Sequence, residues 1–434
     1  MTVGSSSPAL RKEEDTSSVR AWVDGHYPMA LFAVVAVVLY LVAELSFAFL
    51  QSTVIPANAV SGFNAWVRWD SAWYLRIVQD GYFYDGPGKQ AAVAYFPGYP
   101  AMVRAATQVV RNDLVAGVMV SYAAGAAAVA LFHQWCRAAF GLHAARMCVL
   151  VLVLYPFAYY LFGAVYSDAL FLASALGAFV LLESGHPSLA GIVGAVAVGT
   201  RPVGMAVVVG LAFRALEIRG VLEGGPKRFF VESAEGPRPA VGHRTPLLPR
   251  AIRLRRLNWR DTGVLISVLG LAGFCLLLWR DFGDPFVFRK VYSADGWNRT
   301  WEAATLLKTE FFERMRSPGI EYLRIYLGAQ GLITVTGVLL VPLILRRLGW
   351  GYAAYTVIVL ALPGATAAQF LGMGRYALAA FPCFAVVGAA LSSSGSPATA
   401  GLPLRAWGAA AWLVLSGAGL VLMMSLYARW YLIS

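Results

Sequence analysis

The feature that most restricts the fold of this chain is a series of long apolar runs. Met29–Gln51 and Trp407–Tyr427 each hold enough apolar residues to cross a bilayer as a helix, which takes about 20 residues. Backbone amides inside a bilayer must pair within their own segment, so such runs form helices. The sequence therefore predicts an all-α polytopic membrane protein with about eleven transmembrane helices. The expected ranges are Met29–Gln51, Ala94–Val110, Leu114–Trp135, Met147–Gly163, Ala169–Leu182, Leu189–Phe213, Thr262–Trp279, Tyr322–Leu345, Trp350–Pro363, Tyr376–Leu391 and Trp407–Tyr427.

The composition agrees with a membrane protein. Hydrophobic residues make up 59% of the 434 residues and charged residues only 13%, about half of the share in soluble domains. The net charge of +12 is attributed to basic cytoplasmic loops rather than to nucleic-acid binding. The polar segment 1–28 is expected to be a cytoplasmic tail without a cleavable signal peptide, followed by a single transmembrane domain, 29–434.

The distribution of charge sets the expected orientation. The segment 214–261 is the most basic loop, so it should be cytoplasmic, and alternation then places 52–93 and 280–320 outside. Carboxylates gather in these two external loops, whereas a transporter would pair ionisable groups deep in the bundle. The pattern favours chemistry outside the membrane, with a lipid or glycan transporter as the rival class.

Several kinds of site have no signal in the sequence. The four cysteines show no CxxC spacing and the five histidines form no metal-binding pattern, so we expect no metal site and no cofactor. Metal dependence stays open, because loop carboxylates alone can bind a cation. There is no glycine-rich phosphate loop between a strand and a helix, so a nucleotide sugar would lack a binding site.

The stretch Arg68–Tyr82, RWDSAWYLRIVQDGY, is unusual in a chain with so few charges. Its aromatic residues lie near helical spacing, which favours a short helix along the membrane interface. An interfacial aromatic belt, with Arg68 on lipid phosphate, would explain most of these side chains. It would not explain Asp70, because anionic lipid repels a carboxylate. A carboxylate at the mouth of a membrane cavity is suited instead to be a general base.

Further motifs follow this stretch in order. They are Tyr95-Phe96-Pro97 with Pro100, YPFAYYLFGAVYSDALF (Tyr155–Phe171), GTRPVG (Gly199–Gly204), GDPFVF with the later Trp297, and GRYALAAFPCF (Gly374–Phe384). With Trp69-Asp70 and Gly81-Tyr82, this series resembles the GPI mannosyltransferase II family and its bacterial relatives, within the GT-C glycosyltransferase superfamily. The chain departs from the family at Asp168, where relatives often carry Glu, and it matches only loosely between Arg289 and Thr300.

The resemblance implies a GT-C bundle whose first external loop carries short interfacial helices and the catalytic residue. It implies an inverting transfer of a sugar, usually mannose, from a polyprenyl phosphate to a lipid- or glycan-linked hydroxyl on the extracytoplasmic face. Asp70 is then the general base, and Arg375 is expected to hold the donor phosphate. The other candidate substrate-binding residues are Arg68, Trp69, Tyr95, Asp168, Arg201, Trp297, Arg299 and Tyr376.

Some points stay open at the level of sequence. Strict alternation of the expected spans puts Asp168 on the cytoplasmic side, and a single miscounted span would bring it to the external cavity. The sugar could also be arabinofuranose or glucose, and the acceptor is not identified. The bias towards Arg, Ala, Gly and Val suggests a bacterial protein of the plasma membrane.

Overall fold

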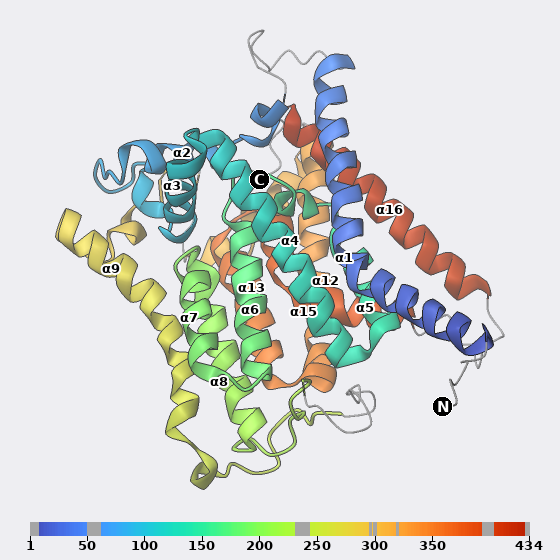
Figure 1. The fold of residues 1–434 in the computed structure, drawn as a ribbon. Coiled ribbons are helices and arrows are strands. Elements are labelled where there is room, and N and C mark those ends of the chain that lie inside the picture. Colours follow the sequence, from blue (N-terminus) through green and yellow to red (C-terminus); the bar gives the residue numbers. More distant parts are fainter. Residues whose placement is uncertain are drawn as a thin grey trace.

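A computed structural model describes residues 8–49, 62–230, 244–294, 297, 302–317, 321–392 and 403–429 (Figure 1). In these ranges the chain folds into helices and turns, with one isolated antiparallel bridge between Leu222 and Ile252. The predicted all-α class is confirmed. The α-helices are α1 (Pro8–Phe49), α2 (Ser71–Asp80), α3 (Gly98–Val110), α4 (Asp113–Phe140), α5 (Leu142–Val153), α6 (Asp168–Glu183), α7 (Pro187–Val198), α8 (Met205–Arg219), α9 (Leu269–Phe282), α10 (Ala303–Leu306), α11 (Thr309–Arg316), α12 (Glu321–Leu348), α13 (Trp350–Thr366), α14 (Met373–Ala379), α15 (Phe381–Ser392) and α16 (Pro403–Ala428).

Short 3₁₀ segments connect or extend these helices. They are η1 (Gly62–Trp66), η2 (Ala92–Ala94), η3 (Ala158–Leu161), η4 (Pro202–Gly204), η5 (Leu254–Arg256), η6 (Trp259–Val268) and η7 (Val287–Lys290).

Five helical stretches in the described part of the chain are long and apolar enough to cross a membrane alone. The bent pair α14–α15, with 75° between its two helices, passes the same test as a unit, and α5, α7 and α13 are shorter apolar helices. A polytopic membrane protein is thus supported, while the number of about eleven spans stays a prediction. The spans tested are Gly25–Ser46, Asp113–Phe140, Trp259–Phe282, Leu323–Leu348 and Trp407–Ala428.

The core lies where α4, α5, α6, α8, α13 and α15 pack against one another (Figure 1). Helix α6 is apolar on every side and almost entirely buried, as expected for a helix at the centre of a bundle. Small residues let the helices approach closely: a Cβ on Gly125 of α4 would lie 1.8 Å from the carbonyl oxygen of Leu161. Helices α1 and α16 pack side by side at the periphery, where Ser46 and Ser425 share a hydrogen bond of 3.0 Å.

Several expected spans differ from the structure. Met147–Gly163 is α5 followed by η3, Tyr376–Leu391 is the bent pair α14–α15, and two further differences concern the surroundings of Asp168. The run Leu189–Phe213 is not one helix, because α7 ends at Val198 and α8 begins at Met205. Between them, Pro202 lacks the backbone N–H that a continuous helical hydrogen-bond pattern needs. The two helices then lie side by side, since a Cβ on Gly194 of α7 would meet Leu211 and Val207 of α8. The expected span Ala94–Val110 is the 13-residue helix α3, which is about 20 Å long and too short to cross a bilayer.

These two differences bear on the position of Asp168 relative to Asp70. With α3 outside the count, Asp168 begins α6 at the level of Asp70, because Arg375 contacts both carboxylates. The fold of α7 back onto α8 brings Arg201 to the same level, where it pairs with Asp168. The structure thus places Asp168 at the level of Asp70, while the side of the membrane on which it lies stays a prediction.

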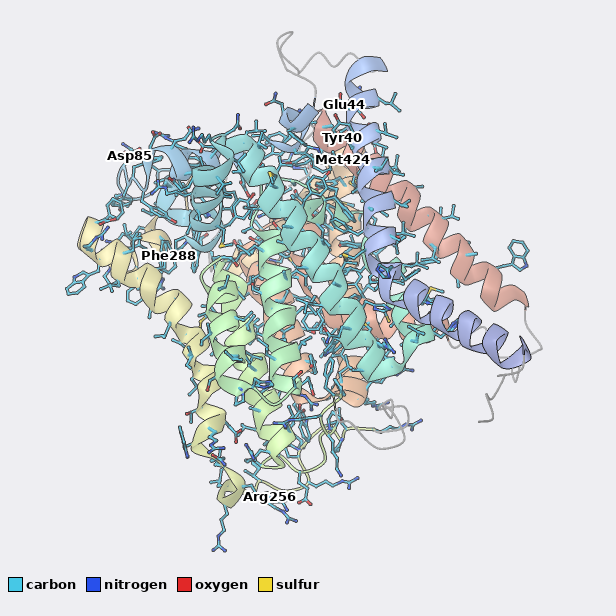
Figure 2. The ribbon with its side chains drawn as sticks, in the orientation of Figure 1. Tyr40, Glu44, Asp85, Arg256, Phe288 and Met424 are labelled. Carbon is cyan, nitrogen blue, oxygen red and sulfur yellow. The ribbon has the colours of Figure 1, made fainter. Side chains whose placement is uncertain are left out.

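The first long loop and the basic loop lie at opposite ends of the molecule. Figure 2 shows Asp85 of the first long loop at one end and Arg256 of the basic loop at the other. The basic loop begins later than expected, after Arg219, because α8 extends that far. Arg214, counted with that loop, is instead fully buried in ion pairs with Glu183 and Glu217.

Candidate active site

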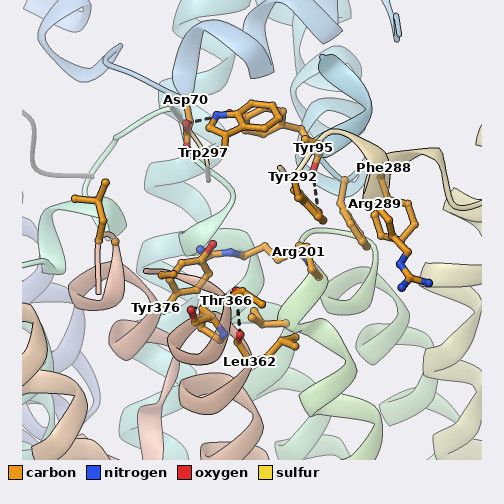
Figure 3. Close-up of a pocket in the computed structure, with 18 of the residues that line it drawn as sticks. Asp70, Tyr95, Arg201, Phe288, Arg289, Tyr292, Trp297, Leu362, Thr366 and Tyr376 are labelled. Carbon is orange, nitrogen blue, oxygen red and sulfur yellow. Dashed lines mark hydrogen bonds between the residues drawn. The ribbon is translucent and has the colours of Figure 1, made fainter. Parts of the chain in front are cut away.

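A cavity of about 1140 Å³ lies between the first long loop, the α7–α8 turn, the loop after α9 and the segment that leads into α14 (Figure 3). Its upper wall carries Asp70 and aromatic side chains, and its other walls carry both apolar and charged side chains. Seven of the ten residues expected from the sequence line it, and Asp168 lies directly behind the wall. The seven are Trp69, Asp70, Tyr95, Arg201, Trp297, Arg375 and Tyr376.

The backbone at Asp70 is fixed by contacts with a distant segment. Asp70 immediately precedes α2, and its amide donates to the hydroxyl of Tyr166 at 3.1 Å. That hydroxyl donates in turn to the carbonyl of Arg68 at 3.0 Å. Trp69 has φ of 51°, in the left-handed region that non-glycine residues rarely adopt and that is enriched at functional sites. The turn therefore holds the Asp70 side chain at a defined place in the cavity wall.

Two donors hold the carboxylate of Asp70. The hydroxyl of Tyr95 donates to Oδ1 at 3.0 Å, and Nη1 of Arg375 donates to Oδ2 at 2.9 Å. Burial and the charge of Asp70 raise the pKa of Tyr95 well above its usual value, so Tyr95 keeps its proton and remains a donor. The side chain of Asp70 is still 26% exposed, which leaves it accessible from the cavity.

Behind Asp70 the charges alternate in sign. Arg375 pairs with Asp70 and lies with its Nε 3.8 Å from Oδ2 of Asp168, and Asp168 forms a hydrogen-bonded ion pair with Arg201. Asp168 is only 3% exposed, so the pair with Arg201 compensates its burial. Tyr376 lies between the two arginines, with ring-to-guanidinium distances of 4.7 Å for Arg201 and 5.5 Å for Arg375. Each of these four charges thus has an opposite charge beside it.

Aromatic rings surround the entrance to Asp70. Trp73 stacks on Tyr95 with their centroids 5.9 Å apart, and Trp297 meets both rings edge-on at 5.9 Å. Flat apolar ring faces bordered by polar groups are suited to contact a sugar ring. Trp73 was not among the expected site residues, although its place three residues after Asp70, near the start of a helix, could have indicated it.

The loop after α9 supplies further charge to the cavity. Asp284 and Lys290 form an ion pair at 2.7 Å, and this hydrogen bond lowers the pKa of Asp284 and raises that of Lys290. Arg289 lines the cavity beside them, and Glu310 of α11 lines it from another side. The sequence analysis did not select these residues; their only signal was their charge in the second long loop.

Of the other expected residues, Arg68 is not brought into the cavity. Arg68 is buried away from it and donates to the carbonyl of Ala428 at the end of α16 through Nε at 3.2 Å and Nη2 at 2.9 Å. It therefore caps a helix C-terminus, where a cation is favoured. Arg299 lies outside the described residues. In the described part of the chain no group of three His, Cys, Asp or Glu side chains is placed to hold a metal ion.

Comparisons with known proteins support the family resemblance in the first half of the chain. The model of a family described as mannosyltransferase (PIG-V) matches residues 43–219, which include Asp70, Tyr95, Asp168 and Arg201. A search of curated protein sequences gave no match.

Solved structures of membrane glycosyltransferases show a distant likeness. ArnT from Cupriavidus metallidurans, bound to undecaprenyl phosphate, is 13% identical with a TM-score of 0.44, and the match covers 93% of this chain and 76% of ArnT. The Archaeoglobus fulgidus oligosaccharyltransferase in complex with Zn and sulfate is 15% identical with a TM-score of 0.42, over 91% of this chain. That match covers 53% of the archaeal protein, so this chain spans about half of its length.

Proposed function

We propose that this chain is a membrane glycosyltransferase of the GT-C type. It transfers a sugar, which we take to be mannose, from a polyprenyl phosphate to a hydroxyl of a lipid- or glycan-linked acceptor. The observation that carries the proposal is the accessible carboxylate of Asp70, held by Tyr95 and Arg375 in the wall of a large cavity. The family match over 43–219 supports the reaction class and mannose as the sugar. The cavity is assigned to the extracytoplasmic face, because the most basic loop lies at the opposite end.

The geometry suits an inverting displacement. The acceptor oxygen attacks the anomeric carbon, and Asp70 takes the proton of the acceptor hydroxyl. The bond from the anomeric carbon to the phosphate oxygen breaks, and its electron pair stays on the phosphate. Tyr95 and Arg375 orient the carboxylate, and the cavity holds the reactants near it, so positioning supplies much of the rate.

The contacts of Arg375 favour a role other than the one expected from the sequence. It was expected to hold the donor phosphate, but its charge already faces Asp70 and Asp168. We assign it to positioning the base. The buried pair of Asp168 with Arg201 is also a feature of transporters, so a lipid or glycan transporter without chemistry is the second candidate.

The test uses purified protein in lipid vesicles with radiolabelled polyprenyl-phosphate mannose and a membrane lipid extract. Wild type should transfer label to an extracted acceptor, and Asp70→Asn should slow transfer by about a hundredfold to ten-thousandfold, because general-base catalysis contributes about 10²–10⁴-fold. The control is Asp80→Asn, which changes an exposed carboxylate of α2 that pairs with Arg76 on the surface. This variant should keep wild-type activity. Movement of intact label across the vesicle membrane without transfer would favour the transporter. Transfer of glucose or arabinofuranose but not mannose would keep the reaction class and change the sugar that we assign to the donor.

A further inference from the structure

The cations of the cavity differ in how they are compensated. Four cationic side chains line the cavity: Arg201, Arg289, Lys290 and Arg375. Arg375 pairs with Asp70, Arg201 with Asp168 and Lys290 with Asp284. Arg289 has no carboxylate partner within the ranges that the structure describes. An anion bound at the first three cations would share the positive charge with a carboxylate, whereas at Arg289 it would not.

The backbone that carries Arg289 is firmly held. Arg289 belongs to η7, and its neighbours Val287 and Val291 are almost fully buried in a small apolar cluster with Phe96, Phe274 and Leu278. The amide of Gly88, from the first long loop, donates to the carbonyl of Lys290 at 3.1 Å. The cation is therefore presented from an anchored turn at the edge of the cavity.

Apolar rings adjoin Arg289 on the same turn. Phe286, which is 52% exposed, and Phe288 both line the cavity, and Figure 3 shows Arg289 beside Phe288, on the far side of Tyr292 from Arg201. A cation next to exposed apolar rings matches a ligand that joins a phosphate to a hydrocarbon chain. Arg201 is less suited to the phosphate, because its charge is neutralised by Asp168.

We infer that Arg289 binds the phosphate of the lipid donor, with Phe286 and Phe288 against the first isoprenoid units. The inference rests on the proposed function and names the group that recognises its donor. A sugar phosphodiester carries one negative charge, which one uncompensated guanidinium matches. When the bond to the sugar breaks, the phosphate becomes a monoester with more charge, so Arg289 also stabilises the leaving group.

Binding of a polyprenyl monophosphate without sugar tests this inference separately from catalysis. The probes are farnesyl phosphate and its neutral analogue farnesol, and the dissociation constant is measured by quenching of intrinsic tryptophan fluorescence in detergent. Arg289→Gln should weaken binding of farnesyl phosphate by about tenfold to a hundredfold and leave farnesol binding unchanged, because a charged hydrogen bond is lost. Arg289→Lys should lie between wild type and Arg289→Gln, since Lys keeps the charge but not the two-pronged geometry.

The matched control is Arg280→Gln, which removes an exposed arginine at the end of α9 that pairs with Asp281 and does not line the cavity. It should bind both probes as wild type does. Equal affinities of wild type and Arg289→Gln for farnesyl phosphate would overturn the assignment of Arg289 and leave the proposed function standing. A wild-type protein that does not bind farnesyl phosphate more tightly than farnesol would overturn both. Melting temperatures of all variants show whether each is folded.

Discussion

At the scale of single residues, the site depends on which partners the carboxylate of Asp70 keeps. Tyr95 and Arg375 come from segments far apart in the chain, the latter 305 residues from Asp70. Each bonds a different oxygen of the carboxylate, so together they fix both the position and the rotation of the side chain. An unassisted aspartate on a loop would sample several rotamers, and only some of them would face an acceptor hydroxyl.

Removing one of these donors should reduce activity without abolishing it. Tyr95→Phe keeps the ring stacked on Trp73 and deletes only the hydrogen bond to Asp70. Since hydrogen bonds to charged groups contribute about 1.5–3 kcal/mol, we expect kcat/KM to fall by about tenfold to a hundredfold. Tyr84→Phe, on the same loop but outside the cavity lining, should retain wild-type activity. If Tyr95→Phe transfers sugar as fast as wild type, the hydrogen bond has no part in holding the base.

The sequence could indicate some of these residues but not their pairing. Asp70 and Tyr95 stand in a motif that the family resemblance identifies, and the mismatch between a carboxylate and a lipid surface marks Asp70 independently. The contact between Asp70 and Arg375 is a property of the tertiary fold, so spacing cannot reveal it. Arg68 shows the opposite error: a charge next to the motif looked functional, whereas its donors satisfy the carbonyl of Ala428.

At the scale of elements, helix formation could be predicted, whereas the complete break between α7 and α8 could not. An apolar run of about 20 residues must be helical in a bilayer, so the general architecture follows from length alone. The same length criterion predicted α7 and α8 as one span, because the residues on both sides of Arg201 and Pro202 are apolar. Because the helix breaks there, the Arg201 side chain lies in the cavity wall. An ionisable residue next to a proline inside an apolar run is a better marker of a functional break than of a continuous span.

The packing of α9 on α7 gives a prediction at this scale. A Cβ on Gly270 would lie 2.1 Å from the carbonyl oxygen of Ala195, whereas a Cβ on Gly273 of the same helix would meet nothing within 4 Å. Gly270→Ala must therefore push α9 away from α7 and should destabilise the protein by about 1–3 kcal/mol. Gly273→Ala should be neutral or stabilise it by up to about 1 kcal/mol, since Ala is the better helix former. Thermal unfolding in detergent measures both.

The displacement of α9 should also affect the donor site. Helix α9 leads directly into the loop with Arg289, so Gly270→Ala should raise the donor KM more than it lowers kcat. Gly273→Ala serves as the control for any effect of an added methyl group on this helix. Equal melting temperatures for the two variants would show that Gly270 does not lie in a close contact between α7 and α9.

At the scale of the whole molecule, the charged clusters occupy two levels with different roles. At the level of the cavity, Asp70 keeps one carboxylate accessible to a ligand. At the other level, Arg214 is fully buried with Glu183 and Glu217, and it donates to the carbonyl oxygens of Pro226 and Lys227 at 2.7 Å. These groups join the start of the basic loop to the ends of α6 and α8. A fully satisfied buried cluster of this kind fixes structure, whereas the accessible carboxylate at the opposite end is available for chemistry.

The orientation of the protein in the membrane can be tested by labelling one residue at each of these two levels. Lys89 and Leu248 are exposed and lie in the first long loop and the basic loop, respectively. Of the four cysteines, Cys136, Cys148 and Cys383 are buried, so Cys275→Ser alone gives a background of low reactivity. A membrane-impermeant maleimide added to intact cells should label Lys89→Cys, and it should label Leu248→Cys only after permeabilisation, because basic loops remain in the cytoplasm. The reverse pattern would place Asp70 and its cavity on the cytoplasmic side. A donor displayed on the outer face could then not reach the base, and the extracytoplasmic reaction would have to be abandoned whatever the transfer assay shows.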